Sequence, residues 1–222
     1  EGRVRQIIEE FVSDPSHKSD DIFIVTDTLT SLPFSHPNVS FVRGSPLEEE
    51  TYRRALLSHA TRVIILSTNY DDPNSDSVAA SVASVIHHLN PHLRVVAECL
   101  NPKHKLLFNN LEGVALVYTL DMANNLLVQE TQDPGVTLLT RAMTSNLVRG
   151  TLASAEVDSP VEDSMSYEHI ASKLLSQHVN LVGVIRDEQV HFSFVDLFLA
   201  VGDRLVYISS SRYTWAALLK TL

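Results

Sequence analysis

The sequence contains little of what many functional sites require. Cys99 is the single cysteine in 222 residues, which excludes an intrachain disulfide, a cysteine-based zinc site and a CxxC redox pair. No apolar run approaches the roughly 18 residues needed to cross a bilayer. The opening residues EGRVRQIIEEF have neither the basic start nor the apolar centre of a signal peptide. These absences predict a folded chain in a reducing, cytoplasmic setting, with no disulfide partner.

Basic residues are also scarce. Lysine and arginine number 17 against 27 aspartates and glutamates, which leaves a net charge of -10, and no Lys/Arg-rich run offsets it locally. Such a surface repels phosphate backbones and anionic lipid headgroups. Nucleic acid is therefore not an expected partner.

Recognisable catalytic motifs are missing as well. The sequence has no G-x-S-x-G elbow and no H-E-x-x-H, and Cys99 falls inside an expected strand, where burial would leave an inert thiol. His88 and His92 are four apart, but Pro91 ends the helix between them, so they do not share a helical face. We predict no enzymatic activity and no zinc site. Ten histidines on an acidic chain do suggest acid sensitivity, since an interfacial histidine titrates near neutral pH.

Short apolar strands and amphipathic helices alternate through the first half of the chain. Hydrophobic residues make up 44% of the sequence, enough for a sizeable core. This alternation predicts an α/β fold with a doubly wound parallel sheet. The strands are expected at Asp21–Asp27, Asn38–Gly44, Arg62–Ser67, Leu93–Leu100 and Gly113–Thr119, and the longer helices at the start of the chain, after Pro46 and at Val78–Leu89.

The pattern changes in the second half. Asp121–Thr131 and Val136–Thr144 read as two helices joined at Asp133-Pro134-Gly135, and they are more apolar than a solvated pair should be. They either cover the parent sheet or form a dimerisation arm. Beyond about Asn146 strands follow strands, which predicts a small separate α+β domain. Its elements are a loop at Val157–Ser166, helices at Tyr167–Gln177 and Tyr213–Leu222, and strands at Val179–Ile185, Gln189–Phe194 and Arg204–Ser210.

Together these segments resemble a known family. The succession of strand, Gly44, acidic helix, RVIILS and a polar loop with Asp76-Ser77 is similar to the N-terminal lobe of RCK domains, the regulators of K+ conductance. MSYEHIASKLL, NLVGVIRDEQVHFSF and Gly202-Asp203 before the last strand resemble the C-terminal lobe. The resemblance implies an N-terminal lobe at 1–120, a crossover helix-turn-helix at 121–145 and a C-terminal lobe at 146–222. It also implies the cytoplasmic gating-ring portion of a prokaryotic ligand-gated potassium channel, which pairs into dimers and an octameric ring and acts on a pore domain of the same gene.

RCK lobes begin with a strand and a glycine-rich turn, and neither is present here. Two explanations stand: the strand and turn are absent from these 222 residues, or the turn has degenerated. The resemblance also leaves an alternative function, a peripheral regulatory subunit of a Trk/Ktr-type potassium transporter. A third reading, a Rossmann-type oxidoreductase fragment, would require a complete phosphate loop and a substrate-side acid or base.

The expected ligand site lies at the carboxyl ends of the parallel strands. Asp27 stands where an acidic residue accepts hydrogen bonds from ribose hydroxyls, and Ser45 and Ser67 follow two further strands. These residues are candidates for binding an adenine nucleotide or NAD. Asp27 is equally explained as a strand-ending turn residue. RCK lobes often carry an acidic residue where this chain has Ser45, which weakens a specific nucleotide prediction.

A divalent cation is the other candidate ligand. Calcium-gated members of the family use three carboxylates at positions that correspond here to Ser67, Glu98 and Leu100, so Glu98 alone keeps the ligand type. That site is therefore expected to be lost. Asp71 and Asp72 lie in the following loop and could form a different Ca2+ site with Glu98, although Asp-Asp-Pro-Asn is also an ordinary turn composition.

Overall fold

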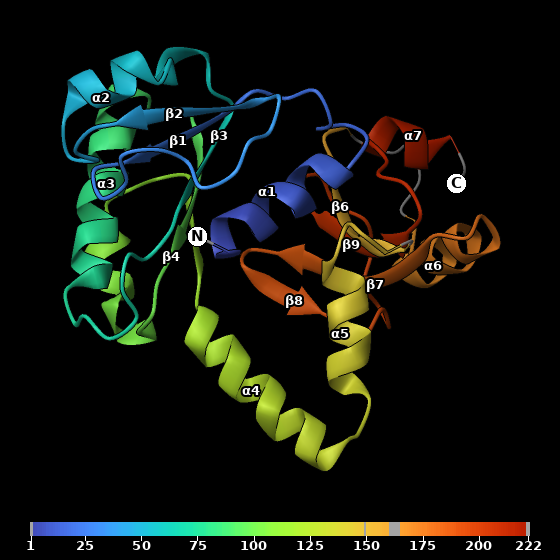
Figure 1. The fold of residues 1–222 in the computed structure, drawn as a ribbon. Helices are drawn as coiled ribbons and strands as arrows, with labels where there is room; N and C mark the ends of the chain where they lie inside the picture. Colours follow the sequence, from blue (N-terminus) through green and yellow to red (C-terminus); the bar gives the residue numbers. More distant parts are fainter. Residues whose placement is uncertain (1, 149, 160–164, 221–222) are drawn as a thin grey trace. The chain divides into compact units, whose positions relative to one another are not determined.

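The structure is a computed structural model that describes residues 2–148, 150–159 and 165–220 (Figure 1). The chain packs as two units. Unit 1 contains Glu1–Ile8 and Ser16–Thr137, and unit 2 contains Glu9–Pro15 and Leu138–Leu222. Helix α1 (Gly2–Ser13), which the opening residues predicted, therefore contributes its first half to unit 1 and its second half to unit 2. The sequence did not suggest this sharing, and the three-part division at 1–120, 121–145 and 146–222 stays a prediction.

Unit 1 is built from parallel strands, as predicted. β1 pairs with β2, and β4 lies between β3 and β5, with every pair parallel. Helices connect β2 to β3, β3 to β4 and β4 to β5, because parallel strands need a crossover connection, while residues 27–38 join β1 to β2 without a helix. The Rossmann-like α/β class is confirmed. The elements are β1 (Ile22–Thr26), β2 (Val39–Arg43), α2 (Glu49–Arg54), β3 (Arg62–Ile65), α3 (Ser75–Leu89), β4 (Arg94–Glu98), the 3-10 helix η2 (Pro102–Phe108) and β5 (Val114–Val117).

The parallel strands form two sheets, and the break between them has a simple interpretation. In the described part of the chain β1 and β3 each end a sheet, since β1-β2 and β3-β4-β5 are not hydrogen-bonded together. In the doubly wound order 3-2-1-4-5-6 the first strand separates the second from the fourth. If β1 and β3 take those two places, the break falls where the first strand would lie. The absent first strand stays a prediction, and the break is what it would leave behind.

The core of unit 1 lies between α3 and the central strand β4. Ala83 and Ile86 of α3 and Val95 and Ala97 of β4 are buried in the same apolar cluster. The alanines of α3 let the helix backbone approach the sheet closely. Cys99 is fully buried in this cluster, and burial raises the pKa of its thiol to about 11. The prediction of a buried cysteine is confirmed, and the thiol stays protonated at neutral pH.

Gly44 fixes how α2 packs beside β2. A Cβ atom on Gly44 would lie 2.4 Å from Oγ1 of Thr51, closer than real Cβ contacts come. Thr51 is completely buried on α2. A glycine is therefore needed at the end of β2 for the close approach of the helix that follows.

Helices α4 (Thr119–Gln132) and α5 (Val136–Thr144) follow β5, within two residues of their predicted bounds. Neither helix, all of whose residues are described, buries a side chain. Glu130 near the end of α4 accepts hydrogen bonds from the backbone N–H groups of Gly135 (3.0 Å) and Thr137 (2.8 Å), so it caps the start of α5. These bonds lower the pKa of the Glu130 carboxyl. Of the described helices, none has the length and apolarity to cross a membrane.

Unit 2 is an antiparallel sheet with the strand order β6-β9-β7-β8. Helix α6 and strands β7 and β9 match the prediction closely. Strand β8 and helix α7 are shorter than predicted, and β6 was not predicted. The expected loop at Val157–Ser166 lies partly outside the described residues. The elements are β6 (Thr151–Glu156), α6 (Tyr167–Ser176), β7 (Asn180–Arg186), β8 (Gln189–His191), β9 (Arg204–Ser209) and α7 (Trp215–Leu219).

A buried carboxylate organises the core of unit 2. Asp203, 1% exposed, accepts hydrogen bonds from Arg186 through Nε (2.6 Å) and Nη2 (2.7 Å), from the Tyr167 hydroxyl (2.6 Å) and from the Ala200 N–H (2.9 Å). Burial alone would raise the pKa of Asp203, but these donors outweigh it and lower the pKa. Tyr167 is fully buried and Arg186 sits nearer the surface. The Gly202-Asp203 pair singled out in the sequence thus anchors the fold of this unit.

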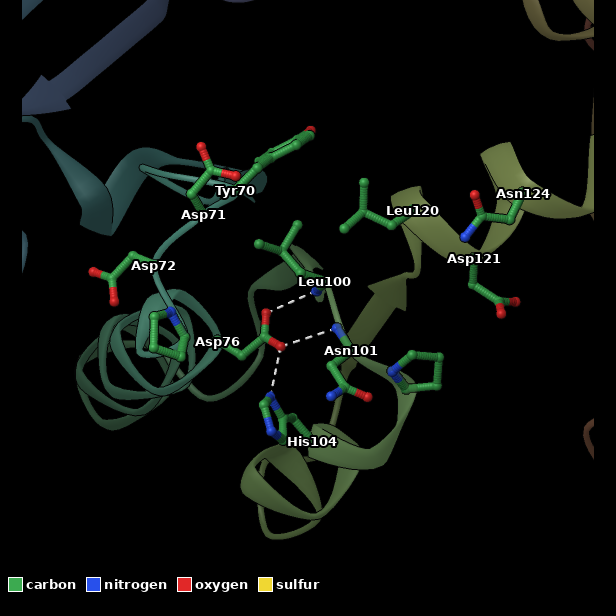
Figure 2. Close-up of a pocket in the computed structure, with 12 residues that line it drawn as sticks. Tyr70, Asp71, Asp72, Asp76, Leu100, Asn101, His104, Leu120, Asp121 and Asn124 are labelled. Carbon is green, nitrogen blue, oxygen red and sulfur yellow. Dashed lines mark hydrogen bonds and ion pairs between the residues drawn. The ribbon is translucent and has the colours of Figure 1, made fainter. Parts of the chain in front are cut away.

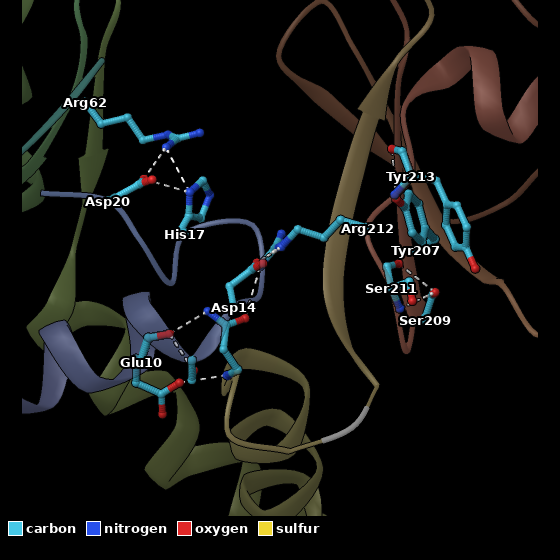
Figure 3. Close-up of polar contacts among 12 residues, drawn as sticks. Glu10, Asp14, His17, Asp20, Arg62, Tyr207, Ser209, Ser211, Arg212 and Tyr213 are labelled. Carbon is cyan, nitrogen blue, oxygen red and sulfur yellow. Dashed lines mark hydrogen bonds and ion pairs between the residues drawn. The ribbon is translucent and has the colours of Figure 1, made fainter. Parts of the chain in front are cut away.

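The second half of α1 is tied into unit 2 by polar contacts (Figure 3). Glu10 accepts hydrogen bonds from the Ser145 hydroxyl (2.8 Å) and the Asn146 N–H (2.7 Å). Asp14, which is buried, forms an ion pair with Arg212, whose guanidinium also donates to the Asn146 side chain (3.1 Å). Residues 9–15 are therefore an integral part of unit 2.

Candidate functional site

The candidate residues at the strand ends fall into two groups. Asp27 directly follows β1 and Ser45 lies two residues after β2, and the two strands are held in register up to the Gly44 N–H, which donates to the Thr26 carbonyl (3.1 Å). Asp27 is exposed, whereas the half-buried Ser45 hydroxyl accepts a hydrogen bond from the Leu47 N–H (3.2 Å). Both lie at the carboxyl edge of the β1-β2 sheet, as predicted. A role in nucleotide binding stays a prediction.

Ser67 and Glu98 belong to the other sheet, and the structure brings them together. The Ser67 N–H donates to Oε2 of Glu98 (2.8 Å), which joins the ends of the adjacent strands β3 and β4. The Ser67 hydroxyl is buried and has no hydrogen-bond partner among the residues that the structure describes. This edge of the sheet therefore contains a buried hydroxyl oxygen whose loss of hydrogen bonds to water is not offset by a bond within the protein.

Glu98 is the centre of a compact polar cluster. Its carboxylate is 3% exposed and accepts hydrogen bonds from Nη2 of Arg3 (2.5 Å), the Tyr70 hydroxyl (2.5 Å) and the Thr119 hydroxyl (2.7 Å), besides the Ser67 N–H. The Arg3 guanidinium also lies 5.1 Å from the centre of the Tyr70 ring, a cation-π arrangement. The donors come from α1, the loop after β3 and the start of α4.

The donors decide the charge of this site. Burial by itself would raise the pKa of Glu98, but the hydrogen bonds from Arg3, Tyr70, Thr119 and Ser67 hold it below its ordinary value. Burial and the hydrogen bond to Glu98 also raise the pKa of the Tyr70 hydroxyl. At neutral pH Glu98 is therefore a charged carboxylate whose lone pairs are already used, which makes it a poor ligand for an added cation.

A pocket of about 450 Å³ lies beside this cluster (Figure 2). It is bounded by the loop after β3, the residues after β4 and the first turns of α4. Its wall carries the carboxylates of Asp71 and Asp121, which are exposed, and of Asp72, which is half-buried, and Leu100 and Leu120 give it apolar surface. Of the residues that line it, none is a lysine or an arginine.

The floor of the pocket is held by Asp76, at the start of α3. Asp76 is buried and accepts hydrogen bonds from the backbone N–H groups of Leu100 (2.7 Å) and Asn101 (3.0 Å) and an ion-pair contact from Nδ1 of His104 (2.8 Å), all drawn in Figure 2. Burial would raise the pKa of Asp76, but these contacts lower it. Asp76 thus fixes the backbone that follows β4.

The predicted cation ligands are not assembled into one site. Asp71 and Asp72 line the pocket, while Glu98 faces Arg3, Tyr70 and Thr119 instead. The described residues contain no group of three or more His, Cys, Asp or Glu side chains that could hold a metal ion. A Ca2+ site formed jointly by Glu98, Asp71 and Asp72 therefore finds no support in this geometry.

Most of the donors in these clusters were not predicted from the sequence. Arg3, Tyr70 and Thr119 carry no motif, and they are 95, 28 and 21 residues from Glu98. Asp76 was noted only as the residue that opens a helix. The one available signal was its position in the first turn of an alanine-rich helix. An acidic residue is also favoured there for a local reason, its interaction with the helix dipole.

Comparisons with known proteins bear on the whole chain. Residues 1–97 match the family described as the calcium-activated potassium channel slowpoke-like RCK domain. The human SLO3 gating ring matches in structure with a TM-score of 0.66 and 14% identity, over 92% of this chain and 42% of that chain. The GsuK RCK domain matches with a TM-score of 0.42 and 16% identity, over 87% and 44%. The GsuK channel bound to NAD matches with a TM-score of 0.41 and 19% identity, over 85% and 32%.

This chain therefore spans about two fifths of the length of the SLO3 chain that it resembles. No curated protein matches it in sequence. At 14% identity the likeness to SLO3 concerns the fold, which is shared over both units.

Proposed function

We propose that this chain is a ligand-sensing RCK regulatory domain of a potassium channel that acts by self-association. Its residues 1–97 match the slowpoke-like RCK family, and its fold resembles that of a gating ring over 92% of the chain. In this proposal copies pair through α4 and α5 and, with their neighbours, form an octameric ring on the cytoplasmic side of the membrane. The ring acts on a pore domain of the same gene. A ligand that binds one arrangement of the copies more tightly shifts the equilibrium, with a coupling of about 1–3 kcal/mol per site.

One observation carries the proposal. No residue of α4 or α5 is fully buried, and Leu127 is 69% and Leu138 is 74% exposed, with further exposed apolar side chains along both helices. Contiguous exposed apolar surface on a folded protein marks an interaction site. Glu130 fixes the turn between the helices, so this surface is presented in a defined shape.

Sedimentation velocity on the 222-residue chain tests self-association. We expect dimers or larger species, and we expect Leu127→Ser together with Leu138→Ser to shift the distribution to monomers. Leu175→Ser is the matched control, because Leu175 is equally exposed but lies on α6. Monomers at every concentration, or identical behaviour of both variants, would remove the basis of the proposal.

The pocket beside Asp76 is the part of the site that favours a ligand class. Its wall carries the carboxylates of Asp71, Asp72 and Asp121, which favour a cation over a phosphate-bearing ligand. An adenine nucleotide or NAD would instead be held at Asp27, Ser45 and Ser67. Thermal unfolding with Ca2+, Mg2+, ATP or NAD separates the two, since a ligand that binds the folded state raises the unfolding temperature. Asp71→Asn with Asp72→Asn should abolish a cation effect and leave a nucleotide effect unchanged.

A further inference from the structure

The pocket of unit 1 carries its carboxylates on two opposite sides, which Figure 2 shows. Asp71 and Asp72 come from the loop after β3, and Asp121 comes from the first turn of α4. Leu100 and Leu120 lie between the two sides and give the middle of the pocket an apolar surface. The negative charge is therefore divided between two ends, with apolar side chains in between.

Two of these carboxylates are oriented by hydrogen bonds within their own elements. Asp72 accepts from the Asn74 N–H through Oδ1 (2.9 Å), and Asp121 accepts from the side-chain amide of Asn125 through Oδ2 (3.1 Å). A carboxylate offers about four lone-pair sites, so each can still accept hydrogen bonds from a ligand. Groups that are oriented before binding lose less conformational entropy when a ligand arrives.

The remaining carboxylate of the pocket, Asp76, has a different role. It is buried, accepts hydrogen bonds from the N–H groups of Leu100 (2.7 Å) and Asn101 (3.0 Å), and contacts Nδ1 of His104 (2.8 Å). The protein itself therefore supplies the donors for Asp76. The carboxylates at the two ends of the pocket are the ones that attract a ligand.

A single metal ion does not match this arrangement. Ca2+ takes about six to eight oxygen ligands around one point. The part of the chain that the structure describes contains no group of three or more His, Cys, Asp or Glu side chains that could hold a metal ion. Carboxylates on opposite sides of a pocket attract positive charge at both places. The pocket therefore suits a cation that is long enough to reach both ends.

We propose that this pocket binds a linear organic diamine, with one ammonium group at Asp71 and Asp72 and the other at Asp121. Each ammonium group donates hydrogen bonds to a carboxylate, and the alkyl chain between the two groups lies along Leu100 and Leu120. The volume of about 450 Å³ is within the range of small-molecule sites, about 300–1,000 Å³. The proposal rests on the ligand sensing proposed above and names the class of the ligand.

Calorimetric titration of the 222-residue chain with two series of amines tests the proposal. One series is the unbranched alkane diamines with an amino group at each end, from two to eight carbons, and the other is the alkylamines of the same lengths. We expect one length at which the diamine binds about fivefold more tightly than the matched monoamine, because it gains a second ion pair. Diamines too short to reach both ends should bind like monoamines. Equal affinity of diamine and monoamine at every length would contradict the proposal.

Substitutions at the two ends locate the site. Asp121→Asn should reduce the affinity of the best diamine to that of the matched monoamine, and so should Asp71→Asn with Asp72→Asn. Asp133→Asn is the matched control, because it removes the same charge from an exposed position at the end of α4 that does not line the pocket. A chain with a net charge of -10 attracts any dication weakly. An equal loss of affinity in the control would show that only this general attraction is measured, and the proposal would be wrong.

The outcomes separate this proposal from the function it rests on. If Ca2+ or Mg2+ binds in a way that depends on Asp71, Asp72 and Asp121, and the diamines do not displace it, the ligand class is wrong and ligand sensing stands. If the diamines bind no better than monoamines while sedimentation shows dimers, the diamine site is wrong and self-association stands. If the diamines bind as expected but only monomers are found, the diamine site stands and self-association is wrong.

Discussion

Two buried carboxylates, one in each unit, are built from the same parts. Glu98 and Asp203 each accept hydrogen bonds from an arginine, a tyrosine hydroxyl and a backbone N–H, and each is less than 4% exposed. Both pKa values are lowered because the donors outweigh the effect of burial. The chemistry alone therefore does not distinguish the two clusters.

Their surroundings do distinguish them. Asp203 accepts hydrogen bonds from two nitrogens of Arg186, and the tyrosine that donates to it, Tyr167, is fully buried in the core. Glu98 is held through one nitrogen of the more exposed Arg3, and its tyrosine, Tyr70, lies at the wall of a pocket. The same set of donors thus forms a fixed part of the core in unit 2. In unit 1 it forms a cluster whose arginine and tyrosine lie nearer the surface and can move more freely.

The chain contains one reporter for each cluster. Trp215, the only tryptophan, is buried in the core of unit 2, and Cys99, the only cysteine, is buried in the core of unit 1. Tryptophan fluorescence therefore follows unit 2, and the rate of thiol labelling follows unit 1. For any variant, Trp215 fluorescence and the rate of Cys99 labelling can both be measured on the same protein.

Asp203→Asn should have the largest effect. It leaves the Arg186 guanidinium without its anion in a partly buried site, which typically costs about 3 kcal/mol in the free energy of unfolding. We expect urea unfolding, followed by Trp215 fluorescence, to shift to lower concentration. A loss below about 1 kcal/mol would contradict a core role for this cluster.

Glu98→Gln should cost less, about 1–2 kcal/mol, because Arg3 can turn to solvent and the amide oxygen still accepts one or two hydrogen bonds. The expected signature is faster labelling of Cys99 by a thiol reagent at low urea. The fluorescence transition of Trp215 should move little. Equal effects on the two reporters would show that the two units unfold together. The proposed difference between the Glu98 and Asp203 clusters would then be wrong.

Acid should weaken both clusters. Since the folded pKa values of Glu98 and Asp203 lie below the ordinary ones, their contribution is complete above roughly pH 5 and is lost as the pH falls through about 4 and below. In Glu98→Gln the pH dependence of Cys99 protection should become weaker, and the pH dependence of the Trp215 transition should be unchanged. Labelling and fluorescence measured from pH 7 to pH 3 give both curves.

Arg3→Met should have the smallest effect, about 0.5 kcal/mol, as for other partly exposed ion pairs. Three donors to Glu98 remain after this change. The rate of Cys99 labelling should depend on the salt concentration in the native protein, because salt screens a partly exposed ion pair. In the variant, which lacks the pair, the rate should not depend on salt. A loss as large as that of Glu98→Gln would mean that Arg3 alone supports the cluster.

The alternating strands and helices could be predicted from the sequence better than the polar clusters could. Parallel strands, the helices of the crossover and Glu98 at a strand end follow from hydrophobic periodicity, which acts over a few residues. Strand β6 was missed because its inward positions are Ala153 and Ala155, which carry little strand signal without the partner β9.

Long-range partners could not be predicted for a related reason. The hydrogen bonds to Glu98 and the Asp14–Arg212 pair join residues from 21 to 198 positions apart. No local pattern marks such residues, because the fold alone brings them together.

The division of α1 between the units means that unit 2 is encoded by two separate stretches of the sequence. A fragment that starts at Leu138 would lack residues 9–15, and Asn146 and Arg212 would lose the acceptors that Glu10 and Asp14 provide. Conversely, cleavage of the backbone in the turn at Asp133–Gly135 leaves those acceptors on the other piece. The two pieces would then remain associated through residues 9–15, so the C-terminal half of this chain depends for part of its stability on a segment that lies far from it in the sequence.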